Sequence, residues 1–244
     1  MMDFTLEKYA ALLDALKVYG LESLVLRHDV DLLPGNSLRT ARLEAEKGLF
    51  GIYYFRAVPE SWDERIILEI AAMGHEIGYH YESLTTCDGN VDKAYEDFCR
   101  NVEALRNLVP VRSICMHGSP RSPYDSKDIW KKYDYKALGI ESEPYLDTDF
   151  SKTFYLTDTG RRWDGYKVSV RDKIPQYQDE WTAKGLTFHS TDDVIDGLCK
   201  EIIPKDLMMT VHPQRWNPFG FSWCKELLLQ NAKNIVKRII IKQK

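Results

Sequence analysis

The chain alternates between short apolar runs and longer segments whose apolar residues recur at helical spacing. Four runs rich in β-branched, aromatic or other apolar residues are typical of buried strands: residues 24–26, 51–56, 74–80 and 111–116. Four segments carry apolar residues three and four positions apart, as amphipathic helices do: residues 5–19, 36–47, 62–73 and 91–106. Strand and helix follow one another in turn, which predicts a parallel sheet covered by helices.

The second half of the chain gives a weaker pattern. It predicts further strands at residues 135–140, 153–156, 185–189 and 207–212, and helices at 192–202 and 221–236. Residues 141–151 and 157–184 are too long for simple connections, so we expect them to form pocket walls. No repeat or linker marks a boundary, and we expect one α/β domain over residues 1–244, either a barrel or a doubly wound sheet.

Charge and cysteine content exclude several classes of protein. A net charge of −4 argues against nucleic acid or an anionic membrane surface as the main partner. The five cysteines include no CxxC pair, which favours a reducing compartment. The N-terminus lacks a signal-peptide pattern, and no window approaches the ~18 apolar residues of a transmembrane helix. We therefore expect a cytoplasmic protein without a transmembrane segment, whose oligomeric state the sequence does not indicate.

Two aspartates follow the first predicted strand. Asp29 and Asp31 are two positions apart, so their side chains would point to the same side, with Cα atoms about 6–7 Å apart. Carboxylates that close raise one another's pKa unless a cation lies between them, which makes a metal ion the natural partner. The alternative is a structural ion pair in which Arg27 neutralises one aspartate.

Further polar residues fall where other predicted strands end. These are His80 and Glu82 on the third strand, His117 on the fourth and His212 on the last. Histidine and carboxylate from separate strands form a site that suits zinc or a similar divalent ion with a position open for water. A lone histidine is more often a structural residue, but together with the aspartate pair these residues favour a metal site.

Two of these stretches resemble motifs of the polysaccharide deacetylase family, the NodB-type or carbohydrate esterase family 4 superfamily. Residues 27–31, Arg-His-Asp-Val-Asp, resemble its aspartate motif, and residues 74–80, Gly-His-Glu-Ile-Gly-Tyr-His, resemble its second motif. Looser matches are residues 121–124 and 211–213. The resemblance implies a distorted (β/α) barrel of about seven parallel strands and metal-dependent deacetylation of amino sugars.

The resemblance also implies roles for individual residues. Asp29 matches the catalytic base, Asp31 and His80 match metal ligands, and His212 matches the general acid. Arg121 matches the arginine that orients the base. His75 matches a histidine that is not a ligand, so we leave it out of the metal shell.

The chain departs from the family pattern at one ligand. The family has a second metal-binding histidine four residues after the first, and this chain has Leu84 there. Leucine cannot bind a metal, so another group must complete the shell, with His117 as first candidate and Glu82 as its substitute. The expected ion is Zn²⁺, with Co²⁺, Ni²⁺ or Mn²⁺ as alternatives.

The long loops supply candidates for substrate binding. Aromatic rings that could stack on a sugar are Tyr145, Trp163, Trp181 and Trp216, although for any one of them burial statistics favour packing under the loops. Arg161 and Arg162 could grip a phosphate or a sugar carboxylate, or could pair with Asp158 and Asp164.

Three functions are compatible with these features. The first is a metal-dependent hydrolase that removes an acetyl group from an amino sugar in a cytoplasmic precursor of a surface polysaccharide, of the O-antigen or capsule type. The second is a catalytically silent carbohydrate-binding protein that has lost the metal. The third is a hydrolase of another C–N amide bond, similar to deformylases or allantoinases, because the metal chemistry is shared and only the pocket differs.

Overall fold

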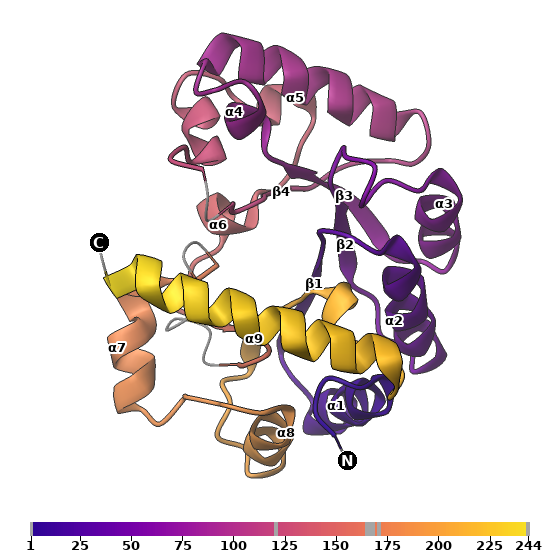
Figure 1. Ribbon diagram of the computed structural model, residues 1–244, viewed down its shortest axis with the longest axis vertical. Coiled ribbons are helices and arrows are strands. Elements are labelled where there is room, and N and C mark those ends of the chain that lie inside the picture. Colours follow the sequence, from indigo (N-terminus) through magenta and orange to yellow (C-terminus); the bar gives the residue numbers. More distant parts are fainter. Residues whose placement is uncertain (1, 120–121, 164–168, 170–171, 243–244) are drawn as a thin grey trace.

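A curled parallel sheet forms the centre of the molecule (Figure 1). The computed structural model describes residues 2–119, 122–163, 169 and 172–242. Within them the strands are β1 (Ser23–Val30), β2 (Ile52–Phe55), β3 (Glu76–Tyr81), β4 (Ile114–Met116), β5 (Phe154–Thr157) and β6 (Asp206–Val211). The strand order is β4-β3-β2-β1-β6-β5, and all pairs are parallel. The predicted α/β class and parallel sheet are confirmed.

The described part of the chain contains six strands, one fewer than the expected seven. Beyond β4 the sheet continues only as an isolated bridge between Ser113 and Ser142. The sheet therefore forms a half-barrel, in which β4 and β5 are the outer strands.

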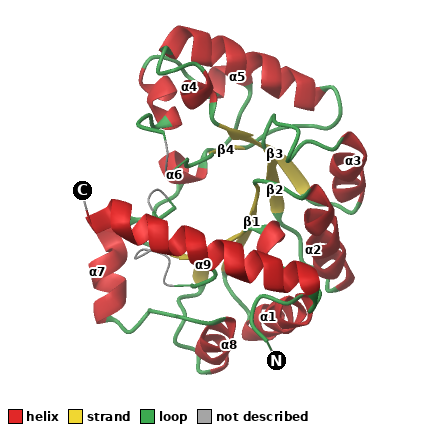
Figure 2. Cartoon of the chain, in the orientation of Figure 1, coloured by secondary structure: helices red, strands yellow, loops and turns green. Residues whose placement is uncertain are grey.

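The helices of the described residues are α1 (Leu6–Tyr19), α2 (Pro34–Glu46), α3 (Glu64–Ala72), α4 (Ser83–Thr86), α5 (Val91–Arg106), α6 (Pro144–Asp147), α7 (Pro175–Ala183), α8 (Thr191–Cys199) and α9 (Phe221–Lys242). Helices such as α1, α2, α3 and α5 cover the convex side of this sheet, and α9 crosses in front of it (Figure 2). Local sequence sets their ends: Thr5 caps α1 by accepting from Lys8 N, and Gly20 ends it at φ 64°. No helix within the described residues is long and apolar enough to cross a membrane.

Two of the weaker strand predictions were wrong. Residues 135–140 contain the short 3₁₀ helix η2 (Lys136–Leu138), and residues 185–189 form no strand. In both segments the apolar side chains are buried without strand pairing; Leu186 and Phe188, for example, pack into the core. Burial of alternate side chains does not require a strand partner, which explains the false signal. The predicted long loop 157–184 contains helix α7, which begins at Pro175.

The two faces of the sheet differ in polarity. Alternate residues of each strand, such as Val30 of β1 and Tyr79 of β3, pack outward against the helices. The residues between them point into the half-barrel, where Arg27, Asp29 and His80 are buried. The interior of the half-barrel is therefore lined by polar groups, and the hydrophobic core lies between sheet and helices.

A buried carboxylate interrupts that outer core. Glu44 of α2 is fully buried, accepts hydrogen bonds from the hydroxyls of Tyr9 and Tyr53, and lies 2.9 Å from His28 Nε2. Burial by itself raises the pKa of Glu44, but the charge and hydrogen bond of His28 and the hydrogen bond of Tyr9 lower it overall. Glu44 is thus an ionised group held between α1, α2 and β1.

Candidate metal centre and active site

Three side chains from separate strand ends converge on one point. Asp31 follows β1, His80 lies near the end of β3, and His117 follows β4. His80 Nε2 lies 3.6 Å from Asp31 Oδ1, and His117 Nε2 lies 3.5 Å from the same oxygen. The three potential ligand atoms lie within 4.8 Å of one another. An aspartate and two histidines with this spacing form a ligand set that suits a divalent ion such as Zn²⁺.

Both histidines are oriented by an acceptor on their other nitrogen. His80 Nδ1 lies 2.9 Å from the carbonyl oxygen of Cys115, and His117 Nδ1 lies 2.8 Å from Glu82 Oε2. A carbonyl or carboxylate oxygen can only accept, so each Nδ1 carries the proton and donates it. Each Nε2 is therefore left with a lone pair toward Asp31, as in metal sites whose ligand histidines are held by outer partners.

Asp31 has the properties of a carboxylate prepared for a cation. Its Oδ2 accepts from Gln214 Nε2 at 3.1 Å, whereas its buried Oδ1 has no hydrogen-bond partner among the described residues. Burial raises the pKa of Asp31, but the neighbouring imidazoles of His80, His117 and His212 hold it well below its ordinary value. An ionised oxygen that makes no hydrogen bond and faces the Nε2 atoms of two histidines fits a bound metal ion.

A second possible ligand group overlaps the first. Asp29, His80 and Cys115 also lie close enough to hold an ion. Here, however, both oxygens of Asp29 accept from Arg27, at 2.8 Å from Nε and 2.6 Å from NH2. Burial raises the pKa of the Cys115 thiol well above its ordinary value, which disfavours the thiolate that a metal requires. Of the two groups, Asp31, His80 and His117 are therefore the better candidates for metal ligands.

Glu82 and Leu84 lie outside this ligand set. Glu82 Oε1 accepts from Arg56, and Oε2 accepts from His117 Nδ1. Glu82 therefore orients the candidate ligand His117 and does not take its place. Opposing the effect of burial, these contacts lower the pKa of Glu82 to about 2. Leu84 packs in a small apolar cluster with Ala94 and Ile129.

His212 pairs with a carboxylate that the sequence analysis did not select. Its Nδ1 lies 2.6 Å from Asp158 Oδ1, and Asp158 also accepts from the backbone N–H of His212, from Arg215 and from Trp216 Nε1. Burial raises the pKa of Asp158, but the charges of Arg215 and His212 lower it overall. An ionised Asp158 fixes the proton on Nδ1 of His212 and stabilises the imidazolium.

Glycine is required at one position of the second motif. Gly78 of β3 lies beside Tyr54 of β2, and a Cβ on Gly78 would be 2.4 Å from the Tyr54 ring and 2.9 Å from the carbonyl oxygen of Ser113. The ring of Tyr54 fills the space that Gly78 leaves inside the half-barrel. His75 of the same motif lies elsewhere: Gly51 N donates to its Nδ1, and it has no part in either ligand group within the described residues.

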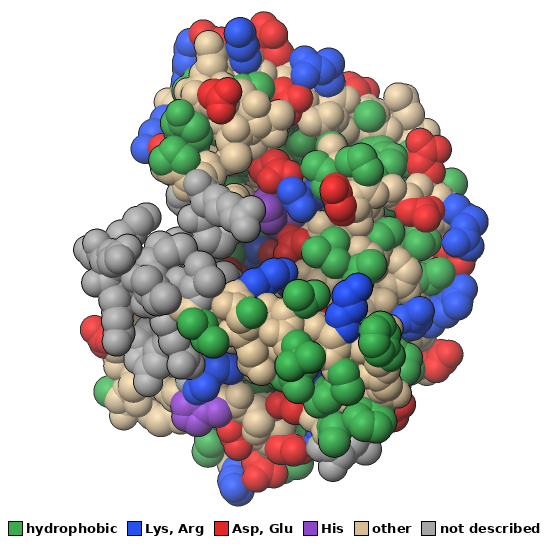
Figure 3. All heavy atoms as spheres, in the orientation of Figure 1, with side chains coloured by type: hydrophobic (Ala, Val, Ile, Leu, Met, Phe, Trp, Pro, Cys, Tyr) green, Lys and Arg blue, Asp and Glu red, His purple; other side chains and the backbone are tan. Residues whose placement is uncertain are grey.

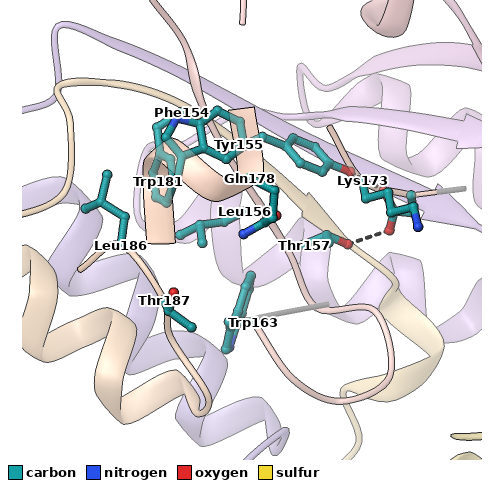
Figure 4. A pocket seen from close by; sticks show the side chains of 11 residues that line it. Phe154, Tyr155, Leu156, Thr157, Trp163, Lys173, Gln178, Trp181, Leu186 and Thr187 are labelled. Atoms are coloured by element: carbon teal, nitrogen blue, oxygen red, sulfur yellow. Dashed lines mark hydrogen bonds between the residues drawn. The ribbon is translucent and has the colours of Figure 1, made fainter. Parts of the chain in front are cut away.

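The structure places three of the candidate sugar-stacking rings in the core. Trp216 is fully buried, and Trp163 is 3% exposed, with its Nε1 donating to Thr191. Trp163 also lines a small cavity of about 20 Å³ beside β5, which has room for roughly one water molecule (Figure 4). Trp181 lines the same cavity. These side chains cannot reach a sugar, so packing explains all three.

The two arginines of the loop after β5 also point away from the ligand group. Arg161 pairs with Glu226 of α9, and its guanidinium lies between the rings of Phe4 and Trp223. Both Arg161 and Arg162 line an open cavity of about 430 Å³ beneath α9. The predicted pairing with Asp158 is not made by these side chains, and Asp164 and Arg121 lie outside the described residues.

Tyr145 is the aromatic candidate that does lie beside the site. Its ring covers the guanidinium of Arg27 at 4.7 Å, and its hydroxyl donates to Asp172 at 2.9 Å. Asp172 also accepts from the hydroxyls of Tyr155 and Thr157. Figure 3 shows a hollow at this face of the molecule, with histidine, acidic and basic side chains at its base.

Three residues of the site escaped the sequence analysis in whole or in part. Asp158 directly follows β5, which is the signal that singled out Asp31 after β1, but the strand was weak and the aspartate was interpreted as an arginine partner. Gln214 gave no signal. Arg27 was considered only as neutralising Asp29, whereas its fork holds both carboxylate oxygens and so orients the group.

Comparison with known proteins adds little. No family model and no curated protein matches the sequence. A solved structure described as a mutant CE4 family pseudoenzyme with restored enzymatic activity matches with a TM-score of 0.37 and 14% sequence identity, over 89% of this chain. The match spans 64% of that protein's chain. The geometry of the site, and not this similarity, therefore carries the proposals below.

Proposed function

We propose that this protein is a metal-dependent hydrolase that removes an acetyl group from an amino sugar. One observation carries the proposal: the Nε2 atoms of His80 and His117 both face Oδ1 of Asp31, which has no hydrogen-bond partner among the described residues. A site that binds sugar without metal has no need of this arrangement, because an ionised oxygen left without a partner in the interior costs free energy.

The ion we propose at this point is Zn²⁺, held by Asp31, His80 and His117, with Co²⁺, Ni²⁺ or Mn²⁺ as alternatives. A divalent ion supplies Lewis acidity, which lowers the pKa of water and polarises a carbonyl group. With three protein ligands, a further coordination position remains for the reactants.

The surrounding residues supply the proton transfers. Asp29 takes the proton of the attacking water; its two oxygens accept from Arg27 but keep lone pairs for this purpose. His212 protonates the departing amine nitrogen as the acyl C–N bond breaks. Asp158 holds His212 at Nδ1, which leaves Nε2 for the substrate. Base and acid thus come from different strands, β1 and β6.

For the substrate we propose an acetylated amino sugar in a precursor of a surface polysaccharide, of the O-antigen or capsule type, acted on by a single domain over residues 1–244. Tyr145 is the side chain we place against the sugar, because its ring borders the Arg27–Asp29 pair. We leave Arg161, Arg162, Trp163 and Trp216 out of the proposed site, because the two arginines line another cavity and the two tryptophans are buried. Arg121, which lies outside the described residues, remains the arginine that we propose to orient Asp29.

Metal content is the decisive test. Protein purified without a histidine tag should hold about one divalent ion per chain by elemental analysis, and Asp31→Ala and His80→Ala should hold none. Asp128→Ala, on an exposed 3₁₀ turn, is the matched control and should retain the ion. Wild type should then deacetylate soluble acetylated amino sugars, and added chelator should abolish the activity.

The two other functions predict different results. A silent sugar-binding protein would hold no ion and would bind glycans equally well with and without chelator. A hydrolase of another amide would hold the ion, lose it in the same variants, and act on formamides or cyclic amides but not on acetylated sugars.

A further inference from the structure

Helix α9 directs some of its polar side chains toward the protein. Trp223 Nε1 donates to the carbonyl oxygen of Asp3 at 2.9 Å, and Asn234 Nδ2 donates to that of Gly160 at 2.8 Å. Gln230, on the same side, is 5% exposed. The other polar residues described on the helix, Ser222, Lys225, Asn231 and Lys233, are exposed. Because a helix on the surface of a globular protein usually buries its apolar residues, apolar residues that are exposed on α9 indicate a partner.

A line of apolar residues runs along the outward side of α9, where Lys225 and Asn231 are also exposed. Phe221, Leu228 and Ile235 are 84%, 70% and 61% exposed and follow one another at seven-residue spacing, so they form one line along the helix. Leu229 lies beside this line, 52% exposed. Figure 3 shows hydrophobic side chains gathered along this part of the surface, and such a patch typically marks an interaction surface.

The charges of the helix narrow the choice of partner. Lys225 is exposed beside the apolar line, and Lys233 is exposed further round the helix. The helix sequence contains five Lys or Arg residues and a single acidic residue, Glu226, which pairs inward with Arg161. This segment is strongly basic in a chain whose net charge is −4. An apolar line with basic flanks complements a surface that is both apolar and anionic.

The position of α9 relates this surface to the candidate site. The helix contacts Gly160 and Arg161, which follow the carboxyl end of β5. Asp31 and His117 follow the carboxyl ends of β1 and β4, and in a parallel sheet these ends lie on one side. Figure 1 shows α9 crossing this side of the molecule, and Figure 3 shows the hollow beside it.

We propose that α9 binds the surface of an anionic lipid bilayer, with Phe221, Leu228 and Ile235 inserted between headgroups and acyl chains and the lysines against the lipid charges. A second copy of the chain is a poorer occupant, because pairing two such helices would bring two basic surfaces together. The proposal goes beyond the hydrolase function and does not depend on metal or activity. It places the open face of the half-barrel toward the membrane, where a lipid-linked substrate would be found.

Vesicle binding tests the proposal with the full-length protein. Wild type should float with vesicles of phosphatidylcholine and phosphatidylglycerol, and much less with phosphatidylcholine alone. The double variant Leu228→Gln/Ile235→Gln should bind more than about tenfold more weakly, since two apolar side chains no longer enter the lipid. Lys225→Gln/Lys233→Gln should bind more weakly to the anionic vesicles, and the remaining binding should depend less on salt.

The matched control is Val18→Gln, at an apolar residue of α1 that is 87% exposed. It should bind like wild type, and all variants should keep the wild-type unfolding midpoint because they replace exposed side chains. Equal binding of wild type and Leu228→Gln/Ile235→Gln, or no binding of wild type to anionic vesicles, would overturn the proposal. So would a dimer in solution that this double variant dissociates, because the face would then be an interface between copies.

Discussion

Glu82 Oε2 lies 2.8 Å from His117 Nδ1, on the side of the ring opposite the candidate metal centre. Glu82, which the sequence analysis names as a substitute ligand, therefore orients the candidate ligand His117. It fixes the tautomer of His117 and raises the electron density on Nε2, the atom that faces Asp31. The strength of the site thus depends on a residue outside it.

Removing that carboxylate should weaken the metal site without dismantling it. Glu82→Ala is expected to lower Zn²⁺ affinity by about 10- to 100-fold, because His117 loses the partner that holds its ring and tautomer. Competition with a chelator of known affinity measures the change. Glu141→Ala, at a side chain that is 71% exposed, should leave the affinity unchanged. Unaltered affinity in Glu82→Ala would show that His117 is not a ligand.

The Asp158–His212 pair makes a separate prediction. Asp158→Asn should lower kcat for deacetylation by roughly 10²- to 10⁴-fold, because the amide no longer stabilises the imidazolium that donates the proton. Metal content should stay at the wild-type value, since Asp158 touches none of the three ligands in the described contacts. Assays of kcat beside elemental analysis separate the two effects. Full activity in Asp158→Asn would remove His212 from the proposed mechanism.

The contact between Gly78 and Tyr54 predicts a packing defect. Gly78→Ala should destabilise the protein by about 1–3 kcal/mol or more, because the new Cβ would overlap the Tyr54 ring and approach a backbone carbonyl that cannot move freely. Gly35→Ala is the matched control: it lies in α2 with no atom within 4 Å of the new Cβ, and alanine favours helix. Urea unfolding of the two variants should show opposite signs.

The buried Glu44 gives the protein a pH-dependent stability. Its pKa in the folded chain is lower than the ordinary 4.5, so its contribution is complete above about pH 4.5 and is lost as the pH falls through the folded pKa. Glu44→Gln should lose about 3–5 kcal/mol at neutral pH, because His28 would remain buried without its partner. Its stability should also fall less steeply on acidification.

Urea unfolding at a series of pH values between about 3 and 7 measures this slope. The exposed Glu103→Gln, which removes one side of a surface ion pair, should follow the wild-type curve to within about 1 kcal/mol. Parallel curves for Glu44→Gln and wild type would mean that other carboxylates cause the acid sensitivity.

The first half of the fold was predictable because sequence neighbours there are also neighbours in the sheet. Helix α5 was predicted at its observed bounds, and β1 to β4 pair in order along the chain. In the second half β6 inserts beside β1, and this long-range pairing leaves no trace in local periodicity. Residues 185–189 are an example: an apolar run that packs into the core as a loop has the same sequence pattern as a buried strand.

The site residues that follow or end an apolar strand were predictable from the sequence. Residues that reach the site from loops were not. Asp31, His80 and His117 each follow or end a strong strand, and the structure brings them together. Gln214 reaches Asp31 from a 3₁₀ turn (Pro213–Arg215) 183 residues away in the chain, a contact that only the fold creates. The tryptophans considered for sugar stacking are buried, because sequence shows the type of a side chain but not whether it faces solvent.

The order of strands in the half-barrel also divides the proposed machinery into two parts. The ligands Asp31, His80 and His117 belong to β1, β3 and β4, whereas Asp158 and His212 belong to β5 and β6. Only the β1–β6 ladder joins these two groups of strands within the sheet. That ladder pairs Ser23 to His28 with Asp206 to Val211, and it therefore fixes how the two groups of residues are placed relative to each other. The spacing between the candidate metal site and the Asp158–His212 pair is thus set by one pair of strands.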